Sequence, residues 1–265
     1  HRDQARGDRL QRQDLKDAQE ENLFKARGEG DGIGGDVVSV LIPTKKVIFV
    51  PTDDETLDRV LGGGLPLHHC LMIAGPPGCG KSTLMRKMAA ALAQRGLKCL
   101  YATSDESEKR VKSEFVRTNL FAKYPKSASN VKVIGASDPE AILHAAQSHG
   151  VDVLIVDSFV NDSSAAQLFT EAAHAEKHKM AIVLICHASS GSRFTEARHV
   201  CDGCFSMEHV DPDTLKAVKD ITGIVKMRVL GKYRCGSPMN YGYYRITSNG
   251  LDVYKPSKSD ATATP

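Results

Sequence analysis

The sequence lacks the features of a membrane-spanning or secreted protein. No apolar run reaches the roughly 18 residues that a bilayer-spanning helix needs, and the first residues carry no signal-peptide pattern. The formal net charge is only +3 over 265 residues, so no strong overall field indicates a polyanionic partner. Any such contact must come from a local patch. These absences predict a cytoplasmic protein with no membrane partner.

A disulfide framework is also not indicated. The chain has seven cysteines, an odd number, which suits a reducing compartment. Cys201 and Cys204 form a single C-x-x-C pair, but no second pair or neighbouring histidine pair accompanies it. One pair alone is weak evidence for zinc, so both are expected to be buried thiols.

Composition divides the chain into three parts. Residues 1–35 form a charged, Gln-rich arm followed by a Gly-rich run, residues 36–254 form the predicted catalytic domain, and residues 255–265 form a tail. The Gly-x-Gly pattern within residues 28–35 is also found in dinucleotide sites. However, no strand precedes it and no helix pattern follows it, which favours a flexible linker.

The strongest pattern begins at Gly75. The apolar residues Leu71–Ala74 lead directly into a glycine-rich loop and then into a helix pattern, which is the order of a phosphate-binding P-loop. The predicted nucleotide-binding residues are Gly75, Pro76, Pro77, Gly78, Cys79, Gly80, Lys81, Ser82 and Thr83. Lys81 would contact the β- and γ-phosphates and the Ser82 hydroxyl would ligate Mg²⁺, so ATP and Mg²⁺ are the expected cofactors. The alternative is an ordinary Gly-rich turn that happens to carry a lysine.

Strand and helix patterns alternate after this loop. Strands are expected at residues 98–103, 130–134, 151–156 and 181–186, with helices between them, and several short strands are expected after about residue 202. The segment Thr52–Glu55 has the spacing of a capping box that starts a short helix. The pattern predicts an α/β fold with a mainly parallel sheet flanked by helices and with antiparallel edge strands.

Three carboxylates follow predicted strands. Asp157 comes directly after a continuous apolar run, where a carboxylate would lie beside the phosphate loop and hold Mg²⁺ through water. Asp105 and Glu106 follow the strand 98–103, and either could orient the water that attacks a phosphate. Glu106 is favoured slightly for its reach. The alternative is a pair of acidic residues that favour a helix N-terminus.

The segment after residue 186 carries polar and basic candidates. His187 ends a predicted strand, where it could sense a phosphate or could simply be hydrogen-bonded. The segment Ala188–His199 is expected to be a polar, basic loop. Its Arg193 and Arg198 could contact a nucleic-acid backbone, and the alternative is a solvated surface loop.

Several motifs together resemble one family. Residues 52–65 are similar to the T-G-x-E-E-L-D-R-V-L-G-G-G-L segment of the RadA/Sms family, and residues 100–107, LYATSDES, resemble its L-Y-V-S-G-E-E-S. His187 matches the histidine of its G-H-V-T-K. Residues 232–236, KYRCG, resemble its K-N-R-F-G, and residues 241–251 resemble its closing strand. The resemblance covers about residues 50–254 and implies a RecA-like P-loop NTPase core.

This resemblance implies a ring-forming, DNA-dependent ATPase of recombination or branch migration. It would act as a hexameric ring or a filament on single-stranded DNA, in a cytoplasmic, nucleoid-associated or viral setting. Lys232 and Arg234 would reach the nucleotide of the neighbouring subunit and stabilise charge there. The alternative for these two residues is a basic pair on an edge strand.

Departures from the family pattern leave other readings open. The four-cysteine zinc motif and the protease-like domain are absent from this sequence, Cys235 replaces an aromatic residue, and Gly231 resembles an insertion. DnaB-type helicases share the K-x-R-x-G element, and residues 9–27 could serve as their linker helix. A KaiC-like, ATP-gated protein-assembly switch is the alternative from a different functional class.

Overall fold

The computed structural model describes residues 47–160, 162–177, 179–187, 192–210, 223–237 and 239–256; of these, the side chains of residues 192–194 and of Lys232 are not described. The described residues lie in the compact unit Lys46–Pro265. The predicted arm and the Gly-rich linker lie outside the described residues, so the boundary at residue 35 stays a prediction.

The described elements alternate between strands and helices along the chain. The strands are β1 (Phe49–Val50), β2 (Leu65–Pro66), β3 (Cys70–Gly75), β4 (Cys99–Thr103), β5 (Val131–Gly135), β6 (Val153–Asp157), β7 (Ala181–His187), β8 (Gly203–His209), β9 (Ile224–Tyr233), β10 (Tyr241–Thr247) and β11 (Gly250–Tyr254). The helices are α2 (Glu55–Val60), α3 (Lys81–Gln94), α4 (Glu108–Arg117), α5 (Leu120–Lys123), α6 (Ser127–Asn130), α7 (Pro139–His149), α8 (Ser163–His174) and α9 (Ser192–Val200).

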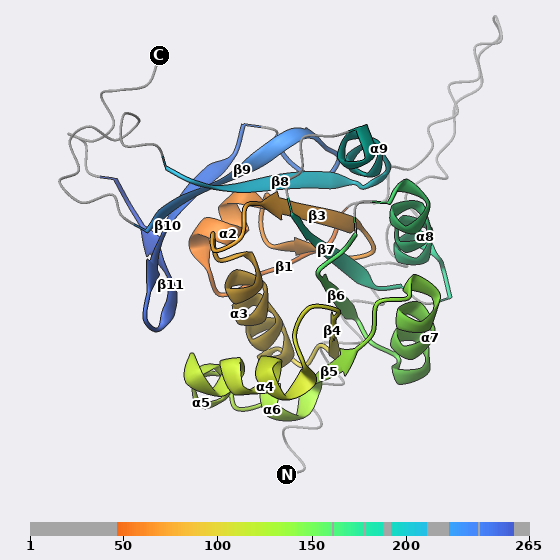
Figure 1. Cartoon of the computed structure of the whole chain (residues 1–265), viewed down its shortest axis with the longest axis horizontal. Helices are drawn as coiled ribbons and strands as arrows, with labels where there is room; N and C mark the ends of the chain where they lie inside the picture. The colour runs from red at the N-terminus through yellow and green to blue at the C-terminus, as the bar shows by residue number, and fades with distance from the viewer. Residues whose placement is uncertain are drawn as a thin grey trace, which may run out of the picture. The chain divides into compact units, whose positions relative to one another are not determined.

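Strands β3 to β11 form one sheet of nine described strands, in the order β11-β10-β9-β8-β3-β7-β6-β4-β5. The six strands from β8 to β5 are parallel, whereas β9, β10 and β11 extend the sheet in antiparallel fashion. This arrangement, with helices around a mainly parallel sheet, is visible in Figure 1. It confirms the predicted fold class, including the antiparallel edge strands. β1 and β2 form a separate two-stranded pair.

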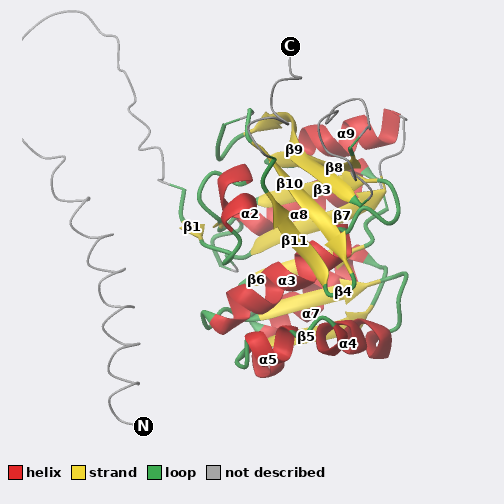
Figure 2. Ribbon diagram, turned by 90° about the vertical axis from the view of Figure 1, so that its left-hand side faces the viewer, coloured by secondary structure: helices red, strands yellow, loops and turns green. Residues whose placement is uncertain are grey.

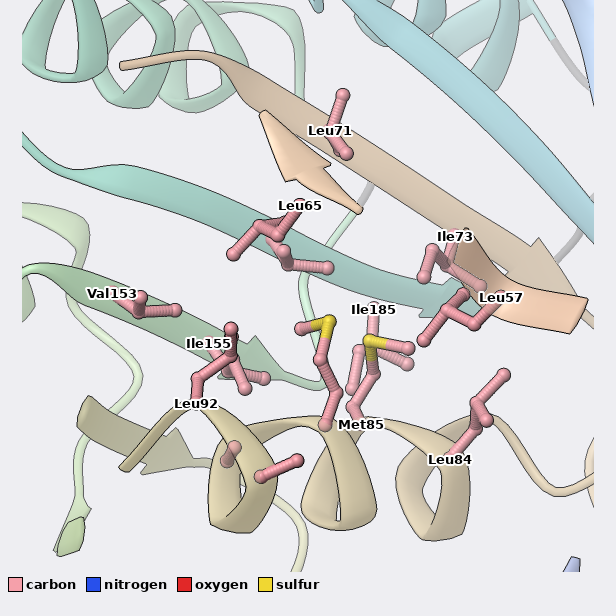
Figure 3. Close-up of a cluster of buried hydrophobic side chains, with 14 of the residues drawn as sticks. Leu57, Leu65, Leu71, Ile73, Leu84, Met85, Leu92, Val153, Ile155 and Ile185 are labelled. Carbon is pink, nitrogen blue, oxygen red and sulfur yellow. The ribbon is translucent and has the colours of Figure 1, made fainter. Parts of the chain in front are cut away.

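The parallel part of the sheet is buried on both faces, which explains the nearly continuous apolar sequences of β3, β4, β6 and β7. On one face, Leu84, Met85 and Leu92 of α3 point toward Ile73, Ile155 and Ile185 of the sheet (Figure 3). The alternate residues of the same strands, such as Met72 and Leu184, belong to a second cluster with residues of α7 and α8. Because successive strand residues point to opposite faces, one central strand serves both clusters.

Polar caps set the helix starts, in one place differently from the prediction. The N-cap of α2 is Asp54, whose side chain accepts hydrogen bonds from the backbone N–H groups of Thr56 and Leu57. The expected capping residue, Thr52, instead donates from both its N–H and its hydroxyl to Asp58. Asp138 and Asp162 cap α7 and α8, and their side chains accept from the backbone N–H groups of Ala141 and Ala165. None of the described helices is both long and apolar enough to cross a membrane.

The segment expected to be a basic loop contains a helix. Residues 188–191 lie outside the described residues, but Ser192–Val200 form α9, so the loop prediction is wrong for most of its length. The sequence of α9 contains good helix formers such as Ala197, and Ala197 is fully buried. Burial of Ala197 against the rest of the protein stabilises α9, a helix that the charged composition of the segment did not indicate.

A bulge interrupts the pairing of β8 with β9. Gly203 pairs with Tyr233, whereas Phe205, two residues on, pairs with Val229, four residues back. Gly231 lies within the extra residues of β9 and has a φ of +82°, which glycine adopts without strain. A bulge bends its strand and re-aims the side chains that follow it. Here it precedes Arg234.

Candidate functional site

The phosphate loop connects the end of β3 to the start of α3. A Cβ atom at Gly75 would lie only 2.1 Å from the backbone oxygen of Met207, so the close approach of β8 requires glycine at this position. The ammonium group of Lys81 donates to the backbone oxygens of Gly75 and Pro76, each at 2.8 Å. Lys81 is largely buried, so its charge is directed into the loop that surrounds it.

Two glycines with positive φ curl this loop. Gly78 has a φ of +78° with open space where a Cβ would be, and Gly80, the N-cap of α3, has a φ of +89°. Because Gly80 has no side chain, it cannot cap the first-turn N–H groups of α3. These groups and the positive end of the helix dipole therefore remain for an anion.

Asp157 lies at the end of β6, on the same edge of the sheet as the loop. It pairs in register with Thr103 of β4 and with Ile185 of β7, two residues before His187. The buried hydroxyl of Tyr101 donates to its Oδ2 atom. Burial, together with the Asp157 carboxylate, raises the pKa of Tyr101 well above its usual value, so Tyr101 stays a hydrogen-bond donor. The Asp157–Ser158 peptide bond is cis.

The two candidate acids after β4 have different partners. Glu106 accepts hydrogen bonds from Arg86 at 3.3 Å and from Arg110 at 3.2 Å. Asp105 accepts from the hydroxyl of Ser158 at 2.5 Å, which ties it to the residue after Asp157. The Arg86 side chain is nearly buried, so its ion pair holds the Glu106 carboxylate close to the protein surface at this edge of the sheet. Both acids stay candidates for orienting a water.

His187 lies directly beside the phosphate loop. It pairs in register with Gly75 across the parallel strands β3 and β7. Its exposed position at the end of β7 is the place that the sequence predicted. The next residues, 188–191, lie outside the described residues.

A pocket that the sequence analysis missed lies beside the loop. It has a volume of about 180 Å³ and is lined by Thr83 and Lys87 of α3, by Thr118, Leu120 and Lys123, and by Asn249, Gly250, Leu251 and Asp252 around the β10–β11 turn. Leu251 packs on the phosphate loop, since a Cβ at Gly80 would lie 2.8 Å from its Cδ1 atom. No sequence signal joins residues 83 and 251, which meet only because the antiparallel strands fold back over α3.

Arg234 lies at the opposite end of β3. Its guanidinium donates to Oδ1 of the buried Asp202 at 2.7 Å, and its backbone N–H donates to the backbone oxygen of Asp202 at 2.9 Å. Oδ2 of Asp202 accepts from the backbone N–H of Cys70, the first residue of β3. The loop begins at Gly75, the last residue of β3, and five residues of strand span about 17 Å. Arg234 is therefore held far from the phosphate loop of its own chain.

The other predicted residues have mixed outcomes. The backbone of Lys232 lies in β9, but its side chain is outside the described residues, as is that of Arg193. Arg198 is half-buried on α9. Cys201 and Cys204 are buried free thiols, which confirms that prediction, and burial raises the pKa of Cys204. The described part of the chain contains no metal-binding group of three or more His, Cys, Asp or Glu residues.

The residues at this edge fit a nucleoside triphosphate with its magnesium ion. The open space at Gly78, the uncapped N–H groups of α3 and the charge of Lys81 form a cradle for phosphates. The Ser82 hydroxyl would supply an oxygen ligand of the kind that Mg²⁺ prefers, and Asp157 would hold the ion through water. When bound, the ion would neutralise phosphate charge.

The fold and this site define a RecA-fold P-loop ATPase. The family described as "ATPase: KaiC" matches residues 50–156. Among solved structures, the flagellar accessory protein FlaH from Methanocaldococcus jannaschii superposes with a TM-score of 0.61 at 18% identity, over 79% of this chain and 98% of that one. The RadB recombinase gives a TM-score of 0.55 at 18% identity, over 76% of this chain and 97% of that one.

More particularly, the chain is similar to DNA repair proteins named RadA. It is 26% identical to RadA of Rickettsia conorii over 86% of this chain and 56% of that protein. It is 31% identical to RadA of Campylobacter jejuni over 76% of this chain and 45% of that protein. The chain thus spans about half the length of the curated relatives that it matches.

Proposed function

We propose that this protein is a DNA-stimulated ATPase that works in recombination or repair as a ring or filament on single-stranded DNA. The observation that carries the proposal is the separation of Arg234 from the phosphate loop of its own chain. An arginine that serves catalysis from this position must serve another subunit. The similarity to RadA proteins supports the partner, DNA.

Within one subunit, the described residues divide the work on the nucleotide. Lys81 and the N–H groups of the loop bind the phosphates, and Ser82 and, through water, Asp157 would hold Mg²⁺. Glu106, with Asp105 as the alternative, orients and polarises the attacking water. His187, in register with Gly75, lies where a change at the phosphates would reach the segment that follows β7.

Between subunits, Arg234 and Lys232 would complete the site. A head-to-tail contact places the β9 end of one copy against the phosphate-loop edge of the next, which is a heterologous interface that closes into a ring or extends as a filament. The guanidinium must then leave or share its bond to Asp202. Arg234 is suited to this exchange because its side chain is 43% exposed although Asp202 is buried. Arg193 and Arg198 are proposed to contact the DNA backbone.

The test of the proposal is the ATPase rate with and without single-stranded DNA. The purified protein should hydrolyse ATP with Mg²⁺ and should do so faster with a single-stranded oligonucleotide, with stimulation that falls as salt rises. A rate that is the same with and without DNA from low to physiological salt would rule out the DNA role.

A second candidate is a KaiC-like, ATP-gated switch whose partner is a protein. The family match over residues 50–156 favours it. Pull-down experiments that recover only protein partners, together with no retardation of DNA, would support this candidate. A DnaB-type helicase activity stays a prediction, which strand-displacement assays test.

A further inference from the structure

The outer face of the antiparallel strands carries a cluster that the nucleotide site does not use. We define the tyrosine platform as Tyr241, Tyr243 and Tyr254 with the cations Lys226, Arg228 and Arg245. Register places Tyr241 opposite Arg228, Tyr243 opposite Lys226 on one side, and Tyr243 opposite Tyr254 on the other. Directly opposite residues share one face of a sheet. Figure 2 shows β9, β10 and β11 side by side.

The other face of these strands is closed by α2. A Cβ at Gly242 would lie 2.2 Å from a methyl group of Thr56, and the hydroxyl of the buried Tyr244 donates to Asp54, the N-cap of α2. The alternate residues Tyr241 and Tyr243 therefore point away from the core. Tyr241 is 51% exposed, an unusually open position for a large aromatic side chain.

Cations already lie over the platform rings. The ammonium nitrogen of Lys226 is 4.8 Å from the ring centre of Tyr241 and 5.8 Å from that of Tyr243. The guanidinium carbon of Arg245 is 5.3 Å from the ring centre of Tyr254. The rings of Tyr241 and Tyr243 meet edge to face with centres 5.8 Å apart. Such contacts orient both the positive charges and the rings at the surface.

Two acids, Glu208 on β8 and Asp252 on β11, lie beside the cations and reduce the positive charge of the platform. Glu208 lies opposite Lys226 and pairs with Arg228 at 3.6 Å, with both side chains about half exposed. Asp252 lies opposite Arg245. Exposed ion pairs of this kind contribute little and exchange readily for another anion. The platform therefore offers three cations to a polyanion, at the small cost of displacing one exposed pair.

We propose that the tyrosine platform binds single-stranded DNA, with bases stacked on Tyr241 and neighbouring rings and phosphates held by Lys226, Arg228 and Arg245. A solvent-facing sheet with aromatic residues and flanking cations suits unpaired bases, because every base has a π-face and every linkage has a charge. The platform is separate from the segment after β7 that contains Arg193 and Arg198. The inference rests on the proposed function only for the identity of the partner, DNA.

One hairpin joins this platform to the nucleotide side. β10 and β11 carry Tyr243, Arg245 and Tyr254 on the outer face, and the turn between them contributes Asn249 and Gly250 to the pocket beside Thr83. Arg117 of α4 also donates to the backbone oxygen of Ser248 in this turn. A strand of DNA that shifts the hairpin would therefore shift a wall of the pocket beside Thr83.

The test is the binding of a dye-labelled 20-nucleotide oligothymidylate to the full chain, followed by fluorescence anisotropy without nucleotide. Tyr241→Ala should weaken binding about tenfold, and Tyr241→Phe should retain it. Lys226→Glu should weaken binding about tenfold and lower the salt slope by about one. Glu208→Gln should strengthen binding about twofold at low salt. Lys132→Glu, on β5 at the other edge of the sheet, is the control with the same charge change and should bind as the wild type does.

Three results would overturn the platform. These are the absence of wild-type binding to the oligothymidylate, equal wild-type affinity for an abasic strand of the same length, and Tyr241→Ala and Lys226→Glu variants that bind as tightly as Lys132→Glu. Parallel ATPase assays separate this inference from the proposed function. DNA that binds through the platform without stimulating hydrolysis refutes only the function, whereas stimulation that survives both platform variants at normal affinity refutes only the platform.

Discussion

The guanidinium of Arg234 is bonded to a carboxylate, that of Asp202, which is 2% exposed and also accepts from the first backbone N–H of β3. Nε2 of His174 lies 2.8 Å from Oδ2 of Asp202, the oxygen that accepts from the Cys70 N–H. One buried carboxylate thus fixes the end of β9 to the start of the strand that leads into the phosphate loop. The position of Arg234 follows from this bond, and so does the expectation that it serves a neighbour.

Mixing two inactive variants tests that expectation. Lys81→Ala should abolish nucleotide binding, and Arg234→Ala should retain binding but lose turnover. A mixture of equal amounts should recover turnover at about a quarter of its sites, because a complete site needs an intact loop from one variant and an intact arginine from the other. The measurement is the steady-state ATPase rate of the mixture. A mixture no more active than its parts would contradict the role in trans.

The stability of Asp202→Asn should depend on pH. Burial alone would raise the pKa of Asp202, but the Cys70 N–H, Arg234 and His174 together lower it below its usual value. The bonds therefore stabilise the fold above the ordinary carboxyl pKa, and this stabilisation is lost as the pH falls through the lowered pKa. Urea unfolding should show a loss of about 2 kcal/mol for Asp202→Asn at pH 7.

At pH 3 the same comparison should show a smaller difference, because the Asp202 carboxyl of the unfolded wild-type chain, with its ordinary pKa, is then largely protonated and part of the stabilisation is lost. Glu55→Gln is the matched control, since Glu55 pairs with Lys255 at the surface and both side chains are largely exposed. It should change stability little at either pH. A constant deficit of Asp202→Asn across this range would mean that charge plays no part.

Tyr101→Phe should weaken the magnesium site without changing the fold. The substitution removes the hydroxyl that orients the Asp157 carboxylate, and a hydrogen bond to a charged group is worth about 1.5 kcal/mol. The Mg²⁺ concentration for half-maximal ATPase should rise about tenfold, and calorimetry should show a smaller gain in ATP affinity on adding Mg²⁺.

Tyr124→Phe provides the control for that experiment. The hydroxyl of Tyr124 is buried and has no hydrogen-bond partner among the described residues. Its removal should leave the Mg²⁺ dependence unchanged and should not lower stability, because no bond is lost. Equal shifts in the two variants would assign the effect to general packing.

Glu106→Gln and Asp105→Asn should separate the two acids after β4. Glu106→Gln should lower the turnover rate about 100-fold with little effect on nucleotide affinity, as expected for a group that acts on the attacking water. Asp105→Asn should have the smaller effect, because the shorter Asp105 side chain has less reach toward the attacking water. The reverse order in single-turnover assays would assign the role to Asp105.

The sequence indicated which residues lie at one edge of the sheet better than it indicated which residues contact one another. Gly75 to Thr83, Asp157 and His187 could be found because each follows an apolar strand, and parallel strands end at one edge. The bond between Asp202 and Arg234 joins residues 32 positions apart, and that between Tyr101 and Asp157 joins residues 56 apart. No local pattern encodes such pairs. They depend on strand order, which the sequence left open.

Three features of the structure differ from the sequence predictions or were missed by them, and each has a physical cause. The N-cap of α2 is Asp54 rather than Thr52 because both residue types can cap, and Thr52 found Asp58 instead. The helix α9 was missed because its stabilising contact, the burial of Ala197, is tertiary. The pocket beside Thr83 was missed for the same reason, since half of it comes from the β10–β11 turn.

In the proposed assembly every copy is polar. The phosphate loop, at one end of β3, accepts an arginine from one neighbour, and Arg234, at the other end, inserts into the site of the other neighbour. An open row of copies then always leaves one loop without an arginine, however long the row becomes. A closed circle leaves none. Turnover per subunit would therefore distinguish short open rows from circles, without any image of the particles.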